Sequence, residues 1–226
     1  MFFDIAYQVQ DEYRKYIKNY FRDKAPLINY KKGELIEADF TSTNYCYCVA
    51  DGIVRQYFID GAGKERTVIL LRPGEIFSEI NMMQGNIDLV ISAAFTDCSV
   101  HRIYQANFAK LFEDNPEFAY QLFMMETTKI RQFLFQIYDG SFYDVDNSLI
   151  NLLSRLSVLF GVRTEAGVLL DIYLSHEDMA KMIGSSRSTV TRSINRLEEK
   201  GYIQSKNKRI TILDRADNPI RTTFSM

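Results

Sequence analysis

The chain has 226 residues and a formal net charge of −2; 46% of its residues are hydrophobic and 25% are charged. This composition is typical of a soluble globular protein, and the length allows one large or two modest domains, each with its own core. No apolar run reaches the roughly 20 residues needed to cross a bilayer, and no charged-then-apolar leader opens the chain. We therefore expect a cytoplasmic protein without a membrane partner. Three cysteines, an odd number, argue against a disulfide framework.

The first half of the chain combines one helix with many short strands. Residues 4–24 place Tyr13, Ile17 and Phe21 at helical spacing. Beyond Pro26, short β-rich runs alternate with glycine-containing turns, which predicts an antiparallel sandwich or barrel. The predicted strands cover residues 27–30, 45–49, 53–59, 66–71, 89–95 and 99–103.

Helical patterns replace the strands after Tyr104. A short helix is predicted over residues 106–112, and another amphipathic helix over residues 146–160. Between them, Asn115-Pro116 opens a long helix that we expect to run to about Asp139 and to end at Gly140. A second apolar stripe could face the β domain; it consists of Phe118, Leu122 and Met125.

The long helix also carries a heptad seam of the kind found in coiled coils, with one acidic interruption. The seam consists of Phe123, Glu126, Ile130, Phe133 and Ile137. Only about two and a half heptads fit, so a helix packed on its own β domain is the alternative to a dimer contact.

Residues 174–203 carry the pattern of a helix-turn-helix. Ser175 predicts an N-cap with Asp178 placed for a capping box, Gly184 supplies the turn, and Ser185-Ser186 offers a second N-cap. The second helix has one apolar stripe, formed by Val190, Ile194 and Leu197. Its opposite face is rich in hydrogen-bond donors and almost free of acids, which suits the major groove of DNA. That face comprises Arg187, Ser188, Thr191, Arg192, Asn195 and Arg196.

Two short strands follow, which predicts a winged helix-turn-helix. Residues 202–204 and 209–213 alternate around a basic turn at residues 205–208, so the wing could touch phosphate. Residues 175–213 contain eight Lys or Arg and four Asp or Glu, a balance of +4, and the remainder therefore carries −6. A basic segment in an otherwise acidic chain indicates contact with phosphates at one place rather than general binding to polyanions. An ordinary helical hairpin with a basic face is the alternative.

The order of these elements resembles the Crp/Fnr family of bacterial transcription regulators over nearly the whole chain. The resemblance is carried by residues 72–79 (RPGEIFSE), Asn115-Pro116, residues 142–145 (FYDV) and residues 183–192 (IGSSRSTVTR). It implies an α+β fold with an antiparallel β-roll of the cupin-like jelly-roll type. The implied domains are an effector-sensing β-roll at residues 1–113, a dimerisation helix at 114–140 and a winged helix-turn-helix at 141–226.

The resemblance further implies a homodimer that is not an enzyme. It would bind double-stranded DNA at a near-palindromic site, respond to a small-molecule effector and contact RNA polymerase. Arg187 and Arg192 match two positions that family members use at the DNA, the second commonly for a guanine, whereas Ser188 replaces a glutamate found in several members. The candidate DNA-binding residues are His176, Ser186, Arg187, Ser188, Thr191, Arg192, Asn195, Arg196, Lys206, Lys208 and Arg209.

The sensing half departs from the cyclic-AMP binders of that family. Residues 80–92 contain no arginine, and Asp88 or its neighbours fall where a cation should hold the cyclic phosphate. On the long helix, Phe133-Leu134 replace a Thr-Ser pair that contacts the adenine in those proteins. We expect a different effector, and an uncharged or aromatic molecule suits the remaining side chains, which could also simply be core. The predicted pocket consists of Phe77, Glu79, Ile80, Met82, Met83, Leu89, Ile91, Phe133 and Tyr138.

The sequence leaves three other functions open. A redox- or metal-responsive regulator would use Cys46, Cys48 and Cys98, since Cys46 and Cys48 share one face of a strand and could approach Cys98. An iron–sulfur cluster, however, needs four cysteine ligands. A constitutive DNA-binding protein would use its β-roll for dimerisation or protein contact alone. A metal-dependent β-barrel enzyme would need two or three histidines, but His101 is the only one in the β region. The sequence thus predicts no catalytic residue and no metal site, and it identifies no cofactor.

Overall fold

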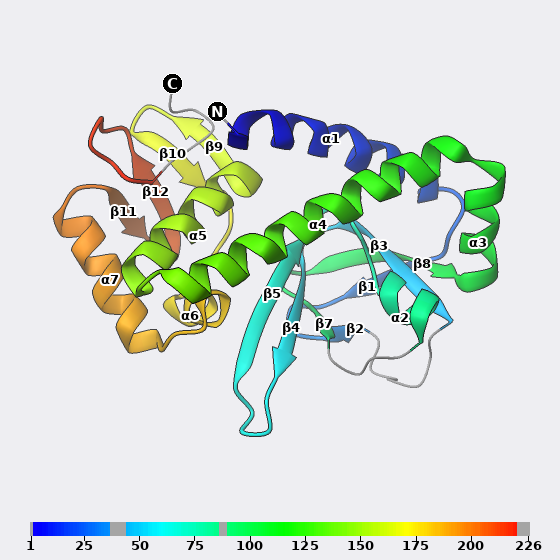
Figure 1. Ribbon diagram of the computed structural model, residues 1–226, viewed down its shortest axis with the longest axis horizontal. Helices are drawn as coiled ribbons and strands as arrows, with labels where there is room; N and C mark the ends of the chain where they lie inside the picture. Colours follow the sequence, from blue (N-terminus) through cyan, green and yellow to red (C-terminus); the bar gives the residue numbers. More distant parts are fainter. Residues whose placement is uncertain (1, 37–43, 86–89, 221–226) are drawn as a thin grey trace. The chain divides into compact units, whose positions relative to one another are not determined.

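The computed structural model describes residues 2–36, 44–85 and 90–220, with side chains from residue 12 onward (Figure 1). The chain divides into two compact units: Ile5–Phe133, and Leu134–Met226 together with Met1–Asp4. None of the helices in the described part of the chain is long and apolar enough to span a membrane.

The unit Ile5–Phe133 is built on two four-stranded antiparallel sheets, which together we call the β-roll. The first sheet has the order β1 (Leu27–Tyr30), β8 (Cys98–Tyr104), β3 (Tyr45–Asp51) and β6 (Ile76–Phe77). The second has the order β2 (Leu35–Ile36), β7 (Ile91–Ala94), β4 (Val54–Ile59) and β5 (Glu65–Leu71). The predicted antiparallel fold is therefore confirmed, and the structure adds the short strands β2 and β6.

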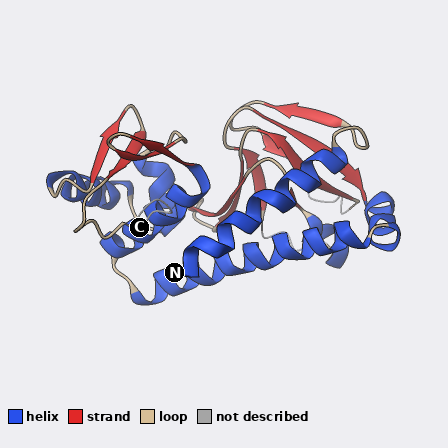
Figure 2. Cartoon of the chain, turned by 90° about the horizontal axis from the view of Figure 1, so that it is seen from above, coloured by secondary structure: helices blue, strands red, loops and turns tan. Residues whose placement is uncertain are grey.

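Two apolar clusters hold this unit together. The inner cluster lies between the sheets and joins Val49, Phe77 and Val100 of the first sheet to Val54 and Leu71 of the second. The outer cluster joins the other face of the first sheet to the helices α1 (Phe2–Phe21), α3 (Gln105–Asp114) and α4 (Pro116–Phe142). Figure 2, seen from above, draws the helices of this unit in blue and the strands of the β-roll in red. The alternation of side chains along β3 and β8 separates the two clusters.

The leading helix packs close to the first sheet at one glycine. Gly74 has a φ of 92°, and a Cβ atom built on it would lie 2.1 Å from the carbonyl oxygen of Arg14 in α1. The turn Pro73-Gly74-Glu75 therefore needs glycine both for its left-handed backbone and for the approach of α1. On α1, the predicted stripe of Tyr13, Ile17 and Phe21 is buried.

The long helix begins at Pro116 as expected but does not end at Gly140. It continues to Phe142, and the amide of Tyr143 still donates to the carbonyl of Asp139 at 3.0 Å. A single glycine costs a helix only about 1 kcal/mol, which neighbouring turns can absorb, so Gly140 is no stop signal here.

The second unit contains the predicted winged helix-turn-helix. Its helices are α5 (Val145–Phe160), α6 (His176–Ile183) and α7 (Arg187–Glu199). Its sheet has the order β11 (Ile203–Lys206), β12 (Arg209–Leu213), β10 (Gly167–Leu170) and β9 (Gly161–Thr164). The hairpin β9–β10 was not predicted; β10 pairs with β12 and so extends the wing into a four-stranded sheet.

Candidate DNA-binding face and effector-sensing site

Side-chain caps fix both helices of the helix-turn-helix. Ser175 forms the predicted capping box: its hydroxyl accepts from the amide of Asp178 at 3.1 Å, and its own amide donates to the Asp178 carboxylate at 2.8 Å. Gly184 follows α6 with a φ of 72°, and the Ser186 hydroxyl then caps α7 by accepting from the Thr189 amide at 3.1 Å. The turn between the helices is thus specified by local chemistry.

Burial of one stripe turns the polar face of α7 outward. Val190, Ile194 and Leu197 are buried as predicted. On the exposed side, Arg187 and Asn195 make no side-chain hydrogen bond to any described residue. Arg192 makes one long contact with the Thr189 hydroxyl, at 3.4 Å. Arg187 and Arg192 therefore keep most of their donors available.

His176 and Thr191 are bound to each other instead. The Nδ1 atom of His176 lies 2.8 Å from the Thr191 hydroxyl, which itself donates to the carbonyl oxygen of Arg187 at 2.9 Å. Because a hydroxyl has one proton to give, His176 Nδ1 must be the donor of the first bond. The pair ties the start of α6 to α7, and Ser186 and Ser188 make a similar local contact at 3.0 Å.

Arg196 is likewise held within the protein. Its Nε atom donates to the Asp146 carboxylate at 3.0 Å, its Nη2 atom pairs with the other oxygen, and Ser193 also donates to Asp146. The hydrogen bond from Arg196 lowers the pKa of Asp146 below its ordinary value. Asp146 lies in the first turn of α5, so this cluster, unforeseen from the sequence, links α5 to α7.

The wing presents two exposed lysines and one constrained arginine. Asn207 and Lys208 form the hairpin turn with φ values of 52° and 60°, and Lys206 and Lys208 are exposed. Arg209 instead pairs with Asp171 at 3.3 Å and lies over the Tyr173 ring at 4.5 Å. Positive φ at both turn residues matches the right-handed twist of the flanking strands.

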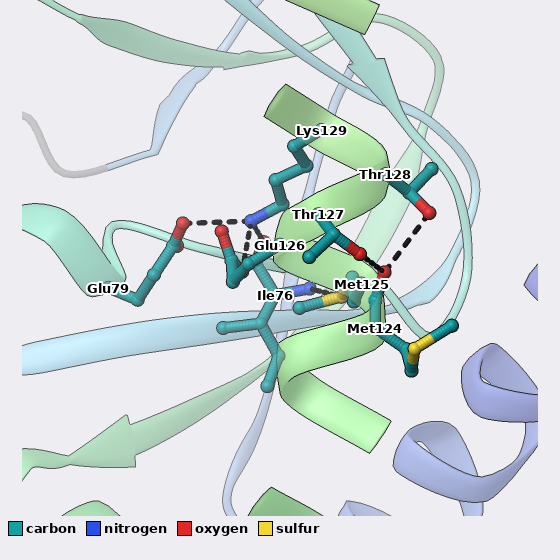
Figure 3. Close-up of polar contacts among 8 residues, drawn as sticks. All are labelled: Ile76, Glu79, Met124, Met125, Glu126, Thr127, Thr128 and Lys129. Carbon is teal, nitrogen blue, oxygen red and sulfur yellow. Dashed lines mark hydrogen bonds and ion pairs between the residues drawn. The ribbon is translucent and has the colours of Figure 1, made fainter. Parts of the chain in front are cut away.

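A buried charge cluster, which we call the Lys129 triad, joins the β-roll to α4 (Figure 3). Lys129 Nζ donates to Glu79 at 2.8 Å, to Glu126 at 3.0 Å and to the carbonyl oxygen of Ile76 at 2.7 Å. Glu79 opens the short helix α2 (Glu79–Gln84), so the contacts span α2, β6 and α4. The second oxygen of Glu79 is buried without a hydrogen-bond partner in the structure.

One cation in the triad faces two carboxyl groups, and the pKa values of Lys129 and Glu126 are shifted as a result. Burial opposes the charge on Lys129, yet Glu79 and Glu126 together raise its pKa above the ordinary value. Burial, opposed by Lys129 and reinforced by Glu79, raises the pKa of Glu126 to about 7. A single lysine neutralises only one buried carboxylate, so the second favours the protonated form.

The other residues predicted for the effector pocket are dispersed. Phe77 belongs to the inner cluster, stacked on Tyr47 at 5.3 Å, whereas Met82 belongs to the outer cluster. Phe133 packs against the inner cluster, and Ile91 is half-buried on β7. The three exposed members are Ile80, Met83 and Tyr138, and Leu89 lies outside the described residues, as does Asp88.

The cysteines do not gather into one site. Cys46 and Cys48 lie in the outer cluster and Cys98 in the inner one, so the expectation that all three could approach one another is wrong. The reason is the sheet itself, because strands β3 and β8 direct these side chains to opposite faces. Burial raises the pKa of Cys48 to about 12 and that of Cys98 to about 11, which suppresses the reactive thiolate. His101 is buried, with Nδ1 3.1 Å from the Ala25 carbonyl.

The heptad seam of α4 is exposed at three of its five positions. Phe123, Ile130 and Ile137 are 65%, 55% and 65% exposed. Glu126 turns to the Lys129 triad, and Phe133 packs on the inner cluster. The apolar row at seven-residue spacing thus has no cover within the described chain.

The last turns of α4 are fixed to α5 by a second buried acid. Asp139 accepts from Asn151 at 2.9 Å and forms an ion pair with Arg155. Lys129 and Asp139 were both missed from the sequence. Lys129 could have been found from the sequence, since it lies four residues after Met125 and so continues the stripe of Phe118, Leu122 and Met125.

A capped helix-turn-helix with a free basic face, joined through one helix to a β-roll, defines a DNA-binding regulator with a sensory domain. Residues 27–115 match the cyclic nucleotide-binding domain, and residues 148–217 match the Crp-like helix-turn-helix domain. The global nitrogen regulator of a Nostoc species is 30% identical over 168 residues, covering 74% of this chain and 75% of that protein. The cyclic AMP receptor protein of Thermus thermophilus is 28% identical, covering 70% of each. The chain belongs to the Crp/Fnr family of transcription regulators.

Solved structures agree on the fold. A CooA mutant from Carboxydothermus hydrogenoformans has a TM-score of 0.75 at 23% identity, covering 86% of both chains. A CRP/FNR-family transcriptional regulator from Thermus thermophilus has a TM-score of 0.66 at 25% identity, covering 84% of this chain and 94% of that one. The Nostoc relative and the Thermus thermophilus CRP/FNR-family protein are regulators rather than enzymes, which agrees with the expectation from the sequence.

Proposed function

We propose that this protein is a homodimeric regulator that reads a near-palindromic DNA site and changes its DNA affinity with a small-molecule effector. The observation that carries the proposal is the exposed face of α7, where Arg187, Arg192 and Asn195 point outward from a buried stripe. An arginine fork suits the O6 and N7 acceptors of guanine and discriminates by about 1–3 kcal/mol per good pair.

The contacts divide into two groups on this proposal. Arg192, Arg187 and Ser188 reach base edges, while Ser186, Asn195 and the wing lysines Lys206 and Lys208 bind phosphate or make secondary contacts. The remaining candidates mainly hold the head in shape, because their polar groups already have partners; they are His176, Thr191, Arg196 and Arg209. An acid at position 188 would accept a hydrogen bond from a cytosine. Because Ser188 stands there instead, this position does not specify a cytosine.

We assign dimerisation to α4. Its exposed row of Phe123, Ile130 and Ile137 would be covered by the same row of a second copy. This keeps the division into a sensing domain at 1–113, a dimer helix at 114–140 and a DNA-binding domain at 141–226. RNA polymerase is the expected further partner of the DNA-bound dimer.

The same helix carries an anchor to each unit. Lys129 binds Ile76 of the β-roll and Glu79 of α2, and Asp139 binds α5, ten residues further along and so about 15 Å along the helix. An effector that alters the Lys129 triad would bias the position of α4, and hence of the DNA-binding head. We propose an effector other than cyclic AMP, uncharged or aromatic, because Phe133 packs on the inner cluster where an adenine contact would need a polar side chain.

Selection of bound duplexes from a random pool tests the proposal. We expect a two-fold site whose half-sites lie about one helical turn, ~10–10.5 bp, apart. The Arg163→Gln variant, altered on the exposed strand β9, should select the same site. Recovery of no two-fold pattern would contradict the proposal. Repeating the affinity measurement with candidate small molecules, oxidant and chelator then separates an effector-responsive regulator from a constitutive one.

A further inference from the structure

A cavity of about 410 Å³ lies beside the end of α1, in the unit Ile5–Phe133. It is lined by α1, β8 and α3, and by none of the nine residues predicted for the effector pocket. Its apolar wall is firm, because Phe21 and Ile103 belong to the buried outer cluster. The volume falls in the range of small-molecule sites, about 300–1,000 Å³.

Three cations line this cavity, and their charges are not neutralised locally. Lys24, Arg102 and Lys110 form no ion pair with a carboxylate anywhere in the described chain, and Asp114 is the one acid among the lining residues. Elsewhere in this unit, the exposed Lys31 does pair with a carboxylate, that of Asp97 at 2.9 Å. The cavity therefore has a positive balance that favours an anionic ligand.

Tyrosine rings place two of these cations. Lys24 Nζ lies 3.7 Å from the centroid of the Tyr20 ring, and the guanidinium carbon of Arg102 lies 4.8 Å from that of Tyr45. Tyr45 and Tyr104 form a tilted pair at 5.6 Å. A guanidinium that lies over an aromatic ring keeps the N–H donors at its edge free. The cavity can therefore bind an anion through these donors and a planar group against the tyrosine rings at the same time.

We propose that this cavity binds a small planar anion, namely an aromatic ring that carries a carboxylate or a phosphate group. Arg102 binds the anionic group through its paired N–H donors, and Lys24 and Lys110 add charge. The tyrosines contact the ring. The backbone of Arg102 is fixed, since its amide donates to the Pro26 carbonyl at 3.0 Å and β8 pairs with β3 around it.

Calorimetric titration of the full chain tests this site with salicylate, phenyl phosphate and the uncharged salicylamide. We expect saturable binding of at least one anion, with affinity about tenfold weaker or worse for salicylamide and for the Arg102→Gln variant. Lys110→Gln should weaken binding as well, whereas Lys64→Gln, which removes an exposed charge on the β4–β5 turn, should not.

The two anions distinguish the sources of the ligand: preference for salicylate indicates a carboxylate, and preference for phenyl phosphate indicates a phosphate. Absence of saturable anion binding, or equal binding by wild type and both cavity variants, would overturn the proposal. Salicylamide bound as tightly as salicylate would do the same. DNA-site selection by Arg102→Gln should match wild type, so this test is independent of the proposed function.

Discussion

Arg187 and Arg192 differ from Arg196 and Arg209 in what their guanidinium groups already bind. The first two are exposed with most donors free, whereas Arg196 is paired with Asp146 and Arg209 with Asp171. All four are arginines within or beside one basic surface. The sequence therefore could not show which of their guanidinium groups are occupied by an acid. The acids that occupy Arg196 and Arg209 come from α5 and from the segment after β10, which only the tertiary fold brings near.

At the residue scale, Arg192→Ala should abolish base discrimination, because a shortened side chain cannot reach guanine O6 and N7. We expect a loss of about 1–3 kcal/mol on the selected site and little change on random DNA. Lys208→Ala should weaken binding to both alike and reduce the salt slope by about one. Fluorescence anisotropy at several salt concentrations measures both. An equal loss on both DNAs for Arg192→Ala would refute its assigned role.

Glu126 gives a second residue-scale prediction, which concerns pH. Its folded pKa is raised from 4.5 to about 7, so the folded state holds the proton more tightly than the unfolded state. The free energy of unfolding should therefore fall as pH rises from about 4.5 to about 7, by up to about 3 kcal/mol, and then level off.

The Glu126→Gln variant should lose this slope, since an amide does not titrate. Urea unfolding at pH 5, 6, 7 and 8 measures it, with Glu113→Gln, an exposed residue of α3, as the control that keeps the slope. A wild-type slope retained by Glu126→Gln would show that another group titrates.

Lys129→Met should be the most damaging change in the triad. It leaves Glu79 and Glu126 buried without a cation, which costs about 3–5 kcal/mol at pH 8. The double variant Lys129→Met/Glu79→Gln should recover part of this loss in urea unfolding. Failure of the second substitution to recover stability would mean that lost packing, and not uncompensated charge, explains the damage.

At the scale of elements, prediction succeeded where local chemistry decides the structure. Ser175, Gly184 and Ser186 specify both ends of α6 and the start of α7 by themselves, so the helix-turn-helix could be located from sequence alone. The helix end predicted at Gly140 was wrong. One glycine weakens a helix only slightly, and Asp139 fixes the last turns of α4. The hairpin β9–β10 was missed because it needs the distant strand β12 as its neighbour.

The link between α5 and α7 gives an element-scale prediction. Arg196→Gln breaks the contact with Asp146 and should lower DNA affinity by a similar factor for every sequence, because the orientation of α7 changes while its base-reading side chains remain. The stability cost should be small, since the pair is exposed. Arg163→Gln breaks an ion pair of similar exposure, to Asp214, and should leave DNA affinity unchanged. A changed base preference for Arg196→Gln would instead place Arg196 at the DNA.

For the whole molecule, the exposed row on α4 decides whether the regulator is a dimer. Phe123, Ile130 and Ile137 recur every seven residues, so one face of the helix is apolar along four turns. A monomer would leave this row in water. A symmetric pair would bury it and would also place two reading heads on the two halves of a palindrome.

Ile130→Glu should therefore convert the dimer to a monomer, because a carboxylate at the centre of the seam cannot be desolvated without a partner. Sedimentation velocity at micromolar concentration should show the mass halved, and affinity for a two-fold site should fall at least tenfold while binding to an isolated half-site is retained. Ala109→Glu adds the same charge at an exposed position of α3 and should leave the dimer intact. A dimer that survives Ile130→Glu would place the subunit contact elsewhere than on α4.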